Sequence, residues 1–370
     1  MVIFAYFKRF LYKCIKKGKI NFLIYERFSC RNELKLEKQS YKNKPRKEDS
    51  CIKREKKLHN DYWHCGDFVY QRYGLAYKQL TDEEILDYVP TYYHHKKLEM
   101  DHSGIDTIYY ANKLVQSRMF IERTIPSATN IAYFDRKKWR SLHNDEILDI
   151  VPIIEKLLSE KESKIFIKPV DGQGGSGIYV LRKFATDYVL NGKVIDINKL
   201  SYHLNKAVYL MQEGLVQSTQ VMRINSSSVN TLRVIVQREN DRMVMKTCSM
   251  RLGQNGADID NSCQGGICIK INVNNGQFDE FAKSRFDGIK YSSHPDSGFE
   301  FKDKVINNWD VLKRQIEDIA TKLIEFKNIA LDIAVTEEGA KLIEFNFRYG
   351  IEHQQCVLGG VRRLLNITNK

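Results

Sequence analysis

The sequence predicts an α+β protein, because helical and strand patterns occupy different stretches of the chain and several strands pair around short turns. Before Lys164 the apolar residues recur at helical spacing, whereas after it they gather in short β-branched and aromatic runs. Two of these runs, 231–237 and 243–250, flank a polar turn and predict an antiparallel pair. A chain of 370 residues is long enough for two or three lobes.

Composition and charge exclude several classes of protein. The longest uninterrupted apolar run, residues 1–7, is too short to span a bilayer. The 21 glycines and 6 prolines exclude collagen-like and low-complexity chains. Residues 1–60 hold 18 basic and 6 acidic side chains, so they carry +12 of the net charge of +13 and the remainder is nearly neutral. The basicity therefore does not indicate a nucleic-acid-binding protein, and no nucleic-acid partner is expected.

The cysteines and the first residues predict a cytoplasmic protein. None of the eight cysteines forms a CxxC pair, and none has zinc-ligand spacing with histidine, so we expect reduced thiols. The N-terminal apolar stretch precedes the lysines and no small-residue cleavage site follows it, which is unlike a signal peptide.

Residues 1–28 predict a basic amphipathic helix. Apolar side chains recur at spacings of three and four, as in Phe4, Phe7 and Leu11, and lysines and arginines fill the other positions. Such a helix suits peripheral contact with the inner face of a membrane or docking on the protein's own core, and both interpretations stay open. Residues 31–60 are polar and rich in lysine and glutamate, which is typical of a linker or an exposed helix.

Three further helices are expected before the strands begin. Thr81 and Glu84 have the spacing of a capping box, which opens the first. The second spans 112–122. The third spans 145–161 and contains Pro152, which leaves its boundary open.

The second part of the chain predicts short strands and one long amphipathic helix, 309–326. The expected strands are 165–167, 178–181, 208–212, 231–237, 243–250, 329–335 and 341–347. This organisation predicts a basic N-terminal segment and linker (1–60), an N-terminal lobe (61–150), a central lobe (151–215) and a C-terminal lobe (216–370).

A glycine-rich loop connects the strands 165–167 and 178–181. Four glycines among residues 172–177 allow backbone N–H groups to approach an anion without obstruction by Cβ atoms. A strand follows the loop, and no Gly-Lys-Ser/Thr ending is present, so it fits neither a Rossmann loop nor a P-loop. We interpret it as a flap over phosphates, with Lys168 on the entering strand; a plain glycine-rich turn is the alternative.

The last hairpin carries an acidic face. Glu344 and Asn346 are two residues apart on one strand, so they share a face. If the hairpin folds about Glu338, Asp332 lies opposite Glu344. Two carboxylates and an amide oxygen suit Mg²⁺, and without a cation the carboxylates would repel each other. The alternative is a polar face that simply meets solvent.

Several segments together resemble one family. They are Ser-Val-Asn-Thr-Leu-Arg at 228–233, Met-Arg-Leu-Gly at 250–253 with Asp260-Asn261 and Gly265-Gly266, and His-Pro-Asp-Ser-Gly at 294–298. With the lysine-and-glycine flap and the acidic hairpin, they resemble the ATP-grasp superfamily, specifically the sugar-transfer-associated ATP-grasp family, over roughly residues 110–350.

This resemblance implies an ATP-grasp fold, in which two α+β lobes clasp ATP and Mg²⁺. It assigns ATP binding to Lys113, Lys168, Gly174, Gly175, Ser176, Gly177, Gln212, Glu213 and Leu215. It assigns Mg²⁺ binding to Asp332, Glu344 and Asn346, charge neutralisation in catalysis to Arg233, Arg251 and Arg348, and substrate binding to Asn230, Thr231 and His294. Lys113 can also be read as an exposed helix lysine. Many relatives carry a Gln-His-Pro-like stretch where this chain has Gln217-Ser218-Thr219.

The activity that the resemblance implies is a carboxylate–amine ligase acting through an acyl phosphate. The expected substrates are a uronic-acid-type sugar or glycan carboxylate and an amino acid or other amine, in biosynthesis of a bacterial surface polysaccharide such as a capsule. The same apparatus could phosphorylate a sugar hydroxyl, with His294 or Asp296 as base. A non-catalytic, basic, membrane-associated nucleotide-binding protein is the third interpretation.

Overall fold

The computed structural model describes residues 26–27, 41, 44–159, 163–172, 174–204, 207–260, 265–284 and 289–369. The helix predicted over residues 1–28 lies outside the described residues except for Glu26 and Arg27. No helix within the described ranges is both long enough and apolar enough to cross a membrane.

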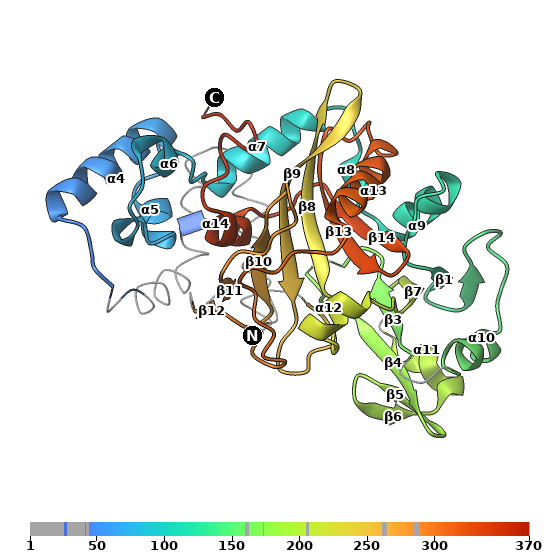
Figure 1. Ribbon diagram of the computed structural model, residues 1–370. Helices are drawn as coiled ribbons and strands as arrows, with labels where there is room; N and C mark the ends of the chain where they lie inside the picture. The colour runs from blue at the N-terminus through green and yellow to red at the C-terminus, as the bar shows by residue number, and fades with distance from the viewer. Residues whose placement is uncertain are drawn as a thin grey trace.

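A sheet of seven antiparallel strands occupies the middle of the molecule (Figure 1). In spatial order its strands are β12 (Lys290–Tyr291), β11 (Ala282–Ser284), β10 (Ile267–Ile271), β9 (Arg242–Leu252), β8 (Thr231–Glu239), β13 (Asn328–Thr336) and β14 (Gly339–Asn346). Strand β13 is buried along almost its whole length because both faces of the sheet are covered. Ile329 and Leu331 pack in one hydrophobic cluster and Ala330 in another.

A second antiparallel sheet of seven strands lies at one end of the molecule, in green in Figure 1. Its strands, in spatial order, are β2 (Trp139–Ser141), β1 (Asn130–Phe134), β7 (Tyr209–Glu213), β3 (Ile165–Pro169), β4 (Tyr179–Phe184), β5 (Asp187–Leu190) and β6 (Lys193–Ile195). Its apolar face packs against Ile154 and Leu200, which belong to two helices. Burial of these faces stabilises the sheet.

Helices cover both sheets. They are α4 (Asp49–Trp63), α5 (Phe68–Arg72), α6 (Asp82–Leu86), α7 (Thr91–Asp101), α8 (Thr107–Tyr110), α9 (Lys113–Glu122), α10 (Ile150–Leu157), α11 (Leu200–His203), α12 (Thr219–Ile224), α13 (Trp309–Thr321) and α14 (Glu352–Leu358), with the short 3₁₀ helices η1 (Leu75–Tyr77) and η2 (Ile197–Lys199). Helices α4, α5 and α6 lie together at the end of the molecule opposite the second sheet (Figure 1). Helix α13 packs its apolar face, including Leu312 and Ile316, in the cluster that covers the central sheet.

Most predicted strands and turns are confirmed. The strands predicted from residue 165 onward all form, and β8 pairs with β9 around the predicted turn. The last hairpin places Asp332 opposite Glu344, as predicted, although the turn pairs Thr336 with Gly339 and a register shift between Asp332 and Ile333 is what brings the two carboxylates opposite each other. The capping box is confirmed too, because the Thr81 side chain accepts from the Glu84 N–H while the Glu84 side chain accepts from the Thr81 N–H.

Two helix predictions need correction. The helix predicted over 145–161 begins only at Ile150, because Asp149 caps it and Pro152 falls in its first turn, where a missing N–H loses no helical hydrogen bond. The segment 31–60 was predicted as a linker or an exposed helix; from Asp49 it forms helix α4, which is not fully exposed because one side is buried against the helices around it.

The strand pairing in the second sheet crosses one of the predicted lobe boundaries. Strand β1 lies in the segment assigned to the N-terminal lobe, yet it pairs with β7 of the central lobe. The predicted boundary at residue 150 therefore falls within one sheet. The four-segment division itself stays a prediction.

Candidate functional site

A cavity of about 660 Å³ is lined by both sheets. This volume is within the range of roughly 300–1,000 Å³ that is typical of small-molecule and cofactor sites. The predicted site residues that line it are Lys113, Lys168, Gly174, Gly175, Ser176, Gln212, Glu213, Leu215, Thr231, Arg233, Arg251, Asp332, Glu344, Asn346 and Arg348. Strands β3 and β7 therefore contribute to one wall, and strands β8, β9, β13 and β14 to another.

The central carboxylate of the cavity is Asp332, which β13 holds opposite Arg233 of β8. Arg233 donates to both of its oxygens, at 2.6 and 3.1 Å, and Arg251 Nη2 lies 3.0 Å from Oδ2. Burial would raise the pKa of Asp332, but the charges of Arg233 and Arg251 outweigh it and hold the pKa below its usual value. Asp332 is therefore a carboxylate that stays ionised between two guanidinium groups.

Two lysines reach the cavity from different elements. Lys113 Nζ, at the start of α9, lies 3.2 Å from Glu344 Oε2 and donates to the Gly172 carbonyl at 2.6 Å. It thus connects the acidic hairpin with the glycine loop. Lys168 Nζ donates to Gln212 Oε1 at 2.5 Å. Burial lowers the pKa of Lys168 to about 8, despite the opposing charge of Glu344.

Gln212 lines the cavity as expected, and its side chain also has partners within the wall. Its amide accepts from Lys168 and donates to Asn130 Oδ1 at 2.8 Å. The side chain therefore fixes a lysine within the cavity wall, and its predicted contact with the nucleotide stays a prediction. Glu213 and Leu215 line the cavity just beyond it.

The glycine loop forms part of the cavity rim. Gly174 and Gly175 have φ values of 65° and 74°, in the left-handed region that favours glycine. Together with Ser176 they line the cavity. Gly177 also has a positive φ, but it faces Pro169 and is not part of the cavity lining. Gln173 lies outside the described residues.

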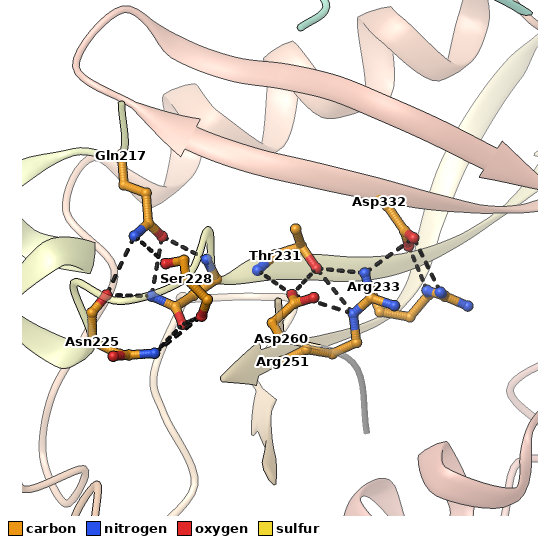
Figure 2. Close-up of polar contacts among 9 residues, drawn as sticks. Gln217, Asn225, Ser228, Thr231, Arg233, Arg251, Asp260 and Asp332 are labelled. Carbon is orange, nitrogen blue, oxygen red and sulfur yellow. Dashed lines mark hydrogen bonds and ion pairs between the residues drawn. The ribbon is translucent and has the colours of Figure 1, made fainter. Parts of the chain in front are cut away.

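A chain of polar contacts runs beside the arginines (Figure 2). Asp260 Oδ2 accepts from the Thr231 N–H at 2.8 Å and from the Thr231 hydroxyl. Arg251 donates to the same hydroxyl oxygen from Nε and Nη2, at 2.9 and 2.6 Å, and its Nε lies 3.6 Å from Asp260 Oδ2. Because Arg251 also contacts Asp332, one guanidinium joins this cluster to the acidic hairpin.

The donor set of the hairpin fits Mg²⁺. Asp332 and Glu344 are directly opposite, and Asn346 follows on the same face of β14. The Asn346 amide is buried and its Nδ2 has no hydrogen-bond partner among the described residues, so the fold does not use this end of the side chain. No group of three His, Cys, Asp or Glu side chains in the described ranges could hold a metal, and the proposed donor set therefore includes the amide oxygen of Asn346.

Two predicted substrate-binding residues do not reach the cavity. Asn230 is fully buried, and its amide bonds to Gln217 and Asn225 in a separate network. His294 is fully buried too, and its Nε2 lies 2.8 Å from the Gly253 carbonyl oxygen. Both predictions are therefore corrected: these side chains stabilise loops next to the site, since their polar atoms are used within the fold.

The cavity also contains residues for which no role was predicted. Asp260 lines the cavity, and its place in the Asp260-Asn261 segment of the family resemblance was the only sequence feature that pointed to it. Glu352, His353 and Gln354 follow Arg348 into the wall, and no motif marked them. Asp258 lines the rim and pairs with Arg182 and Lys164 of the second sheet, the latter at 3.2 Å. These ion pairs connect the two lobes beside the cavity.

Comparison with known proteins agrees with this geometry. The family model described as "Sugar-transfer associated ATP-grasp" matches residues 103–369. No curated protein matches the sequence.

Solved structures show weaker likeness. Carboxyaminoimidazole ribonucleotide synthase from Aspergillus clavatus, complexed with ATP, is 12% identical with a TM-score of 0.39, covering 76% of this chain and 59% of that one. D-alanine–D-alanine ligase from Bacillus anthracis, complexed with ATP, is 10% identical with a TM-score of 0.35, covering 70% and 66%. VanG D-Ala:D-Ser ligase from Enterococcus faecalis is 12% identical with a TM-score of 0.38, covering 70% and 60%. The chain thus spans less than two thirds of the length of these proteins.

Proposed function

The chain belongs to the sugar-transfer-associated ATP-grasp family, and from this membership and the cavity we propose that it is an ATP- and Mg²⁺-dependent carboxylate–amine ligase. The ATP-grasp fold that the motifs predicted is the fold of this family. One observation carries the proposal: the glycine loop with Lys168 and the hairpin with Asp332, Glu344 and Asn346 line a single cavity. In that cavity, a loop that covers phosphates and a set of oxygen donors for a cation can both contact the same nucleotide.

The reaction joins two groups that do not condense in water, because a carboxylate is a poor electrophile. Transfer of the γ-phosphoryl group from ATP to the carboxylate gives an acyl phosphate and ADP. The amine nitrogen then bonds to the acyl carbon, the C–O bond to phosphate breaks, and phosphate leaves with the electron pair. Such transfer depends mainly on alignment and on neutralisation of charge.

The residues of the chain supply this neutralisation. Lys113 and Lys168 would hold the phosphates under the loop of Gly174, Gly175 and Ser176, while Arg233 and Arg251 would stabilise the transferred phosphoryl group. Asp332, Glu344 and Asn346 would hold Mg²⁺, which supplies Lewis-acid neutralisation of the phosphate oxygens when bound. The loop would exclude water that could hydrolyse the acyl phosphate.

The substrates form the finer part of the proposal. We propose a uronic-acid-type carboxylate and an amino acid or other amine, joined during the assembly of a bacterial surface polysaccharide in the cytoplasm. The family's association with sugar transfer supports the sugar, and Arg348 offers a cation on the cavity wall for an anionic acceptor. The charge of +12 in residues 1–60 supports contact with an anionic membrane, which sedimentation with vesicles of anionic against neutral lipid would test.

ADP release tests the reaction. The purified chain is incubated with ATP and Mg²⁺, with glucuronate or galacturonate, and with single amino acids, and the product is weighed by mass spectrometry. A ligase forms an amide and turns over ATP continuously only when a carboxylate and an amine are both present. Continuous ADP release without amine, with a stable phosphate ester on a sugar hydroxyl, would contradict the proposal. Burial of His294 outside the cavity removes one of the two bases considered for that kinase reaction.

A further inference from the structure

The structure points to a role for Asp260 beyond the assignments above. Amide formation needs an unprotonated amine and releases a proton from the attacking nitrogen, so a nearby acceptor for that proton accelerates it. We propose that Asp260 docks the amine substrate and accepts its proton as the C–N bond forms and the C–O bond to phosphate breaks. This inference rests on the proposed ligase function.

Asp260 has one oxygen committed to the fold and one that is not. Oδ2 accepts from both the N–H and the hydroxyl of Thr231, which fixes the orientation of the carboxylate. Oδ1 makes no hydrogen bond with any residue in the described part of the chain, although Asp260 lines the cavity. A buried carboxylate oxygen that faces a cavity can accept from a cationic amine.

The position of Asp260 fits the site of attack. Arg251 contacts Thr231 and Asp260 on one side and Asp332 on the other, as Figure 2 shows. The carboxylate is therefore separated from the acidic hairpin by one guanidinium group. An amine bound to Oδ1 would lie beside the place where the acyl phosphate is stabilised.

The other central carboxylates of the cavity have basic partners at hydrogen-bond distance. Both oxygens of Asp332 contact arginines, Glu344 Oε2 pairs with Lys113, and Asp258 Oδ1 pairs with Lys164 and Arg182. The hydrogen bonds of Asp260 come from the neutral Thr231 N–H and hydroxyl, and its basic neighbour Arg251 stays at 3.6 Å.

The surroundings favour proton acceptance. Burial raises the pKa of Asp260 above its ordinary value, and the charge of Asp332 adds to this, while Arg251 and Thr231 act in the opposite direction. Lys168 of β3 and Cys268 of β10 are the other titratable groups that interact with it. A raised pKa brings a carboxyl group closer to the working range of a general base.

Competition between two nucleophiles tests the proposal. Hydroxylamine traps acyl phosphates as hydroxamates and is largely unprotonated at neutral pH, whereas an amino acid arrives as an ammonium ion. With Asp260→Asn, amide formation at pH 7 should fall by about 10²–10⁴-fold, and hydroxamate formation should fall far less. Raising the pH should restore part of the amide rate, because free amine becomes available without the base.

Asp258→Asn is the matched control, because it makes the same change two residues away. It should lower amide and hydroxamate formation in equal proportion, because it weakens the ion pairs of Asp258 that connect the two lobes. Equal losses of both products in Asp260→Asn, with active wild type, would overturn the inference and leave the ligase function standing. Absence of both products in the wild type would overturn both proposals.

A second variant covers the case in which Asp260→Asn does not fold. Thr231→Val removes the hydroxyl that donates to Asp260 Oδ2 and keeps the backbone donor. The same hydroxyl accepts from Arg251, so its loss should change the pKa of Asp260, and the acidic limb of kcat/KM for the amine should move. A limb that does not move would overturn the role of Asp260.

Discussion

At the residue scale, each carboxylate of the acidic hairpin lies beside basic side chains. Asp332 is compensated by Arg233 and Arg251, and Glu344 by Lys113. Two carboxylates opposite each other on neighbouring strands would otherwise repel and destabilise the hairpin. The basic side chains that would bind phosphates therefore also stabilise the acidic hairpin.

The variant Glu344→Gln tests the metal assignment. It keeps the size and one acceptor oxygen but removes the charge that a divalent cation needs, so turnover should fall by at least about 100-fold. ADP release at several Mg²⁺ concentrations measures the effect. Glu338→Gln, an exposed change in the turn of the same hairpin, is the control. Turnover near the wild-type level in Glu344→Gln would remove the metal assignment.

Gln212 is predicted to position Lys168. Gln212→Ala removes a hydrogen bond to a charged group, worth about 1.5–3 kcal/mol, so KM for ATP should rise by roughly 10- to 100-fold. Asn130→Ala touches Lys168 only through Gln212, so its effect should be smaller. Initial rates at varied ATP concentration measure both. An effect of Asn130→Ala as large as that of Gln212→Ala would contradict this order.

At the element scale, local signals decide where each helix begins. Thr81 caps α6 and Asn112 caps α9, each by accepting backbone N–H groups of the first turn. The Asn112 cap also sets the first residue of α9, Lys113, at the cavity, where it bonds to Gly172 and Glu344. A capping residue thus contributes to the site by fixing the start of a helix.

The capping box gives a prediction about stability alone. Thr81→Ala leaves the first turn of α6 without its side-chain acceptor, which costs about 1 kcal/mol. The melting temperature should fall. ADP release at permissive temperature should stay as in the wild type, because no residue of α6 lines the cavity. Thr81→Ser, which keeps the hydroxyl, is the control. An unchanged melting temperature in Thr81→Ala would contradict the prediction.

At the scale of the whole molecule, buried histidines couple folding to pH. Burial lowers the pKa of His59 to about 4 and that of His94 to about 3. Both values lie below the unfolded value of about 6.5, so the unfolded chain binds protons more readily in acid. The stability contributed by the neutral rings is full above pH 6.5 and is lost as the pH falls toward 4 and then 3.

Acid should therefore begin to destabilise the chain as the pH falls below about 6.5. Each of the two rings should contribute a loss of about 2 kcal/mol by pH 5. Melting temperatures at pH 7 and pH 5 measure this, and His59→Gln should show a smaller difference than the wild type. His143→Gln, at an exposed position, is the control. An equal difference in His59→Gln and wild type would contradict the assignment.

Much of the local structure followed from the sequence, because its causes are local. The alternation along 341–347 places Glu344 and Asn346 on one face, and the turn closes the hairpin between Thr336 and Gly339, whereas the register shift at Asp332 that brings Glu344 opposite it was not predicted. The capping box at Thr81 and the strand after the glycine loop likewise depend on a few neighbouring residues. The family followed from motifs of the same kind, and the family model supports it.

Only the tertiary structure decided which polar side chains reach the cavity. Asn230 and Thr231 are neighbours, yet the first is buried in a separate network and the second faces Arg251, because successive side chains at the start of β8 point in opposite directions. Lys113 meets Glu344 across 231 positions of the chain, and Asp260 meets Arg251 through a loop between strands. Such contacts depend on how distant elements pack, which no local spacing of residues specifies.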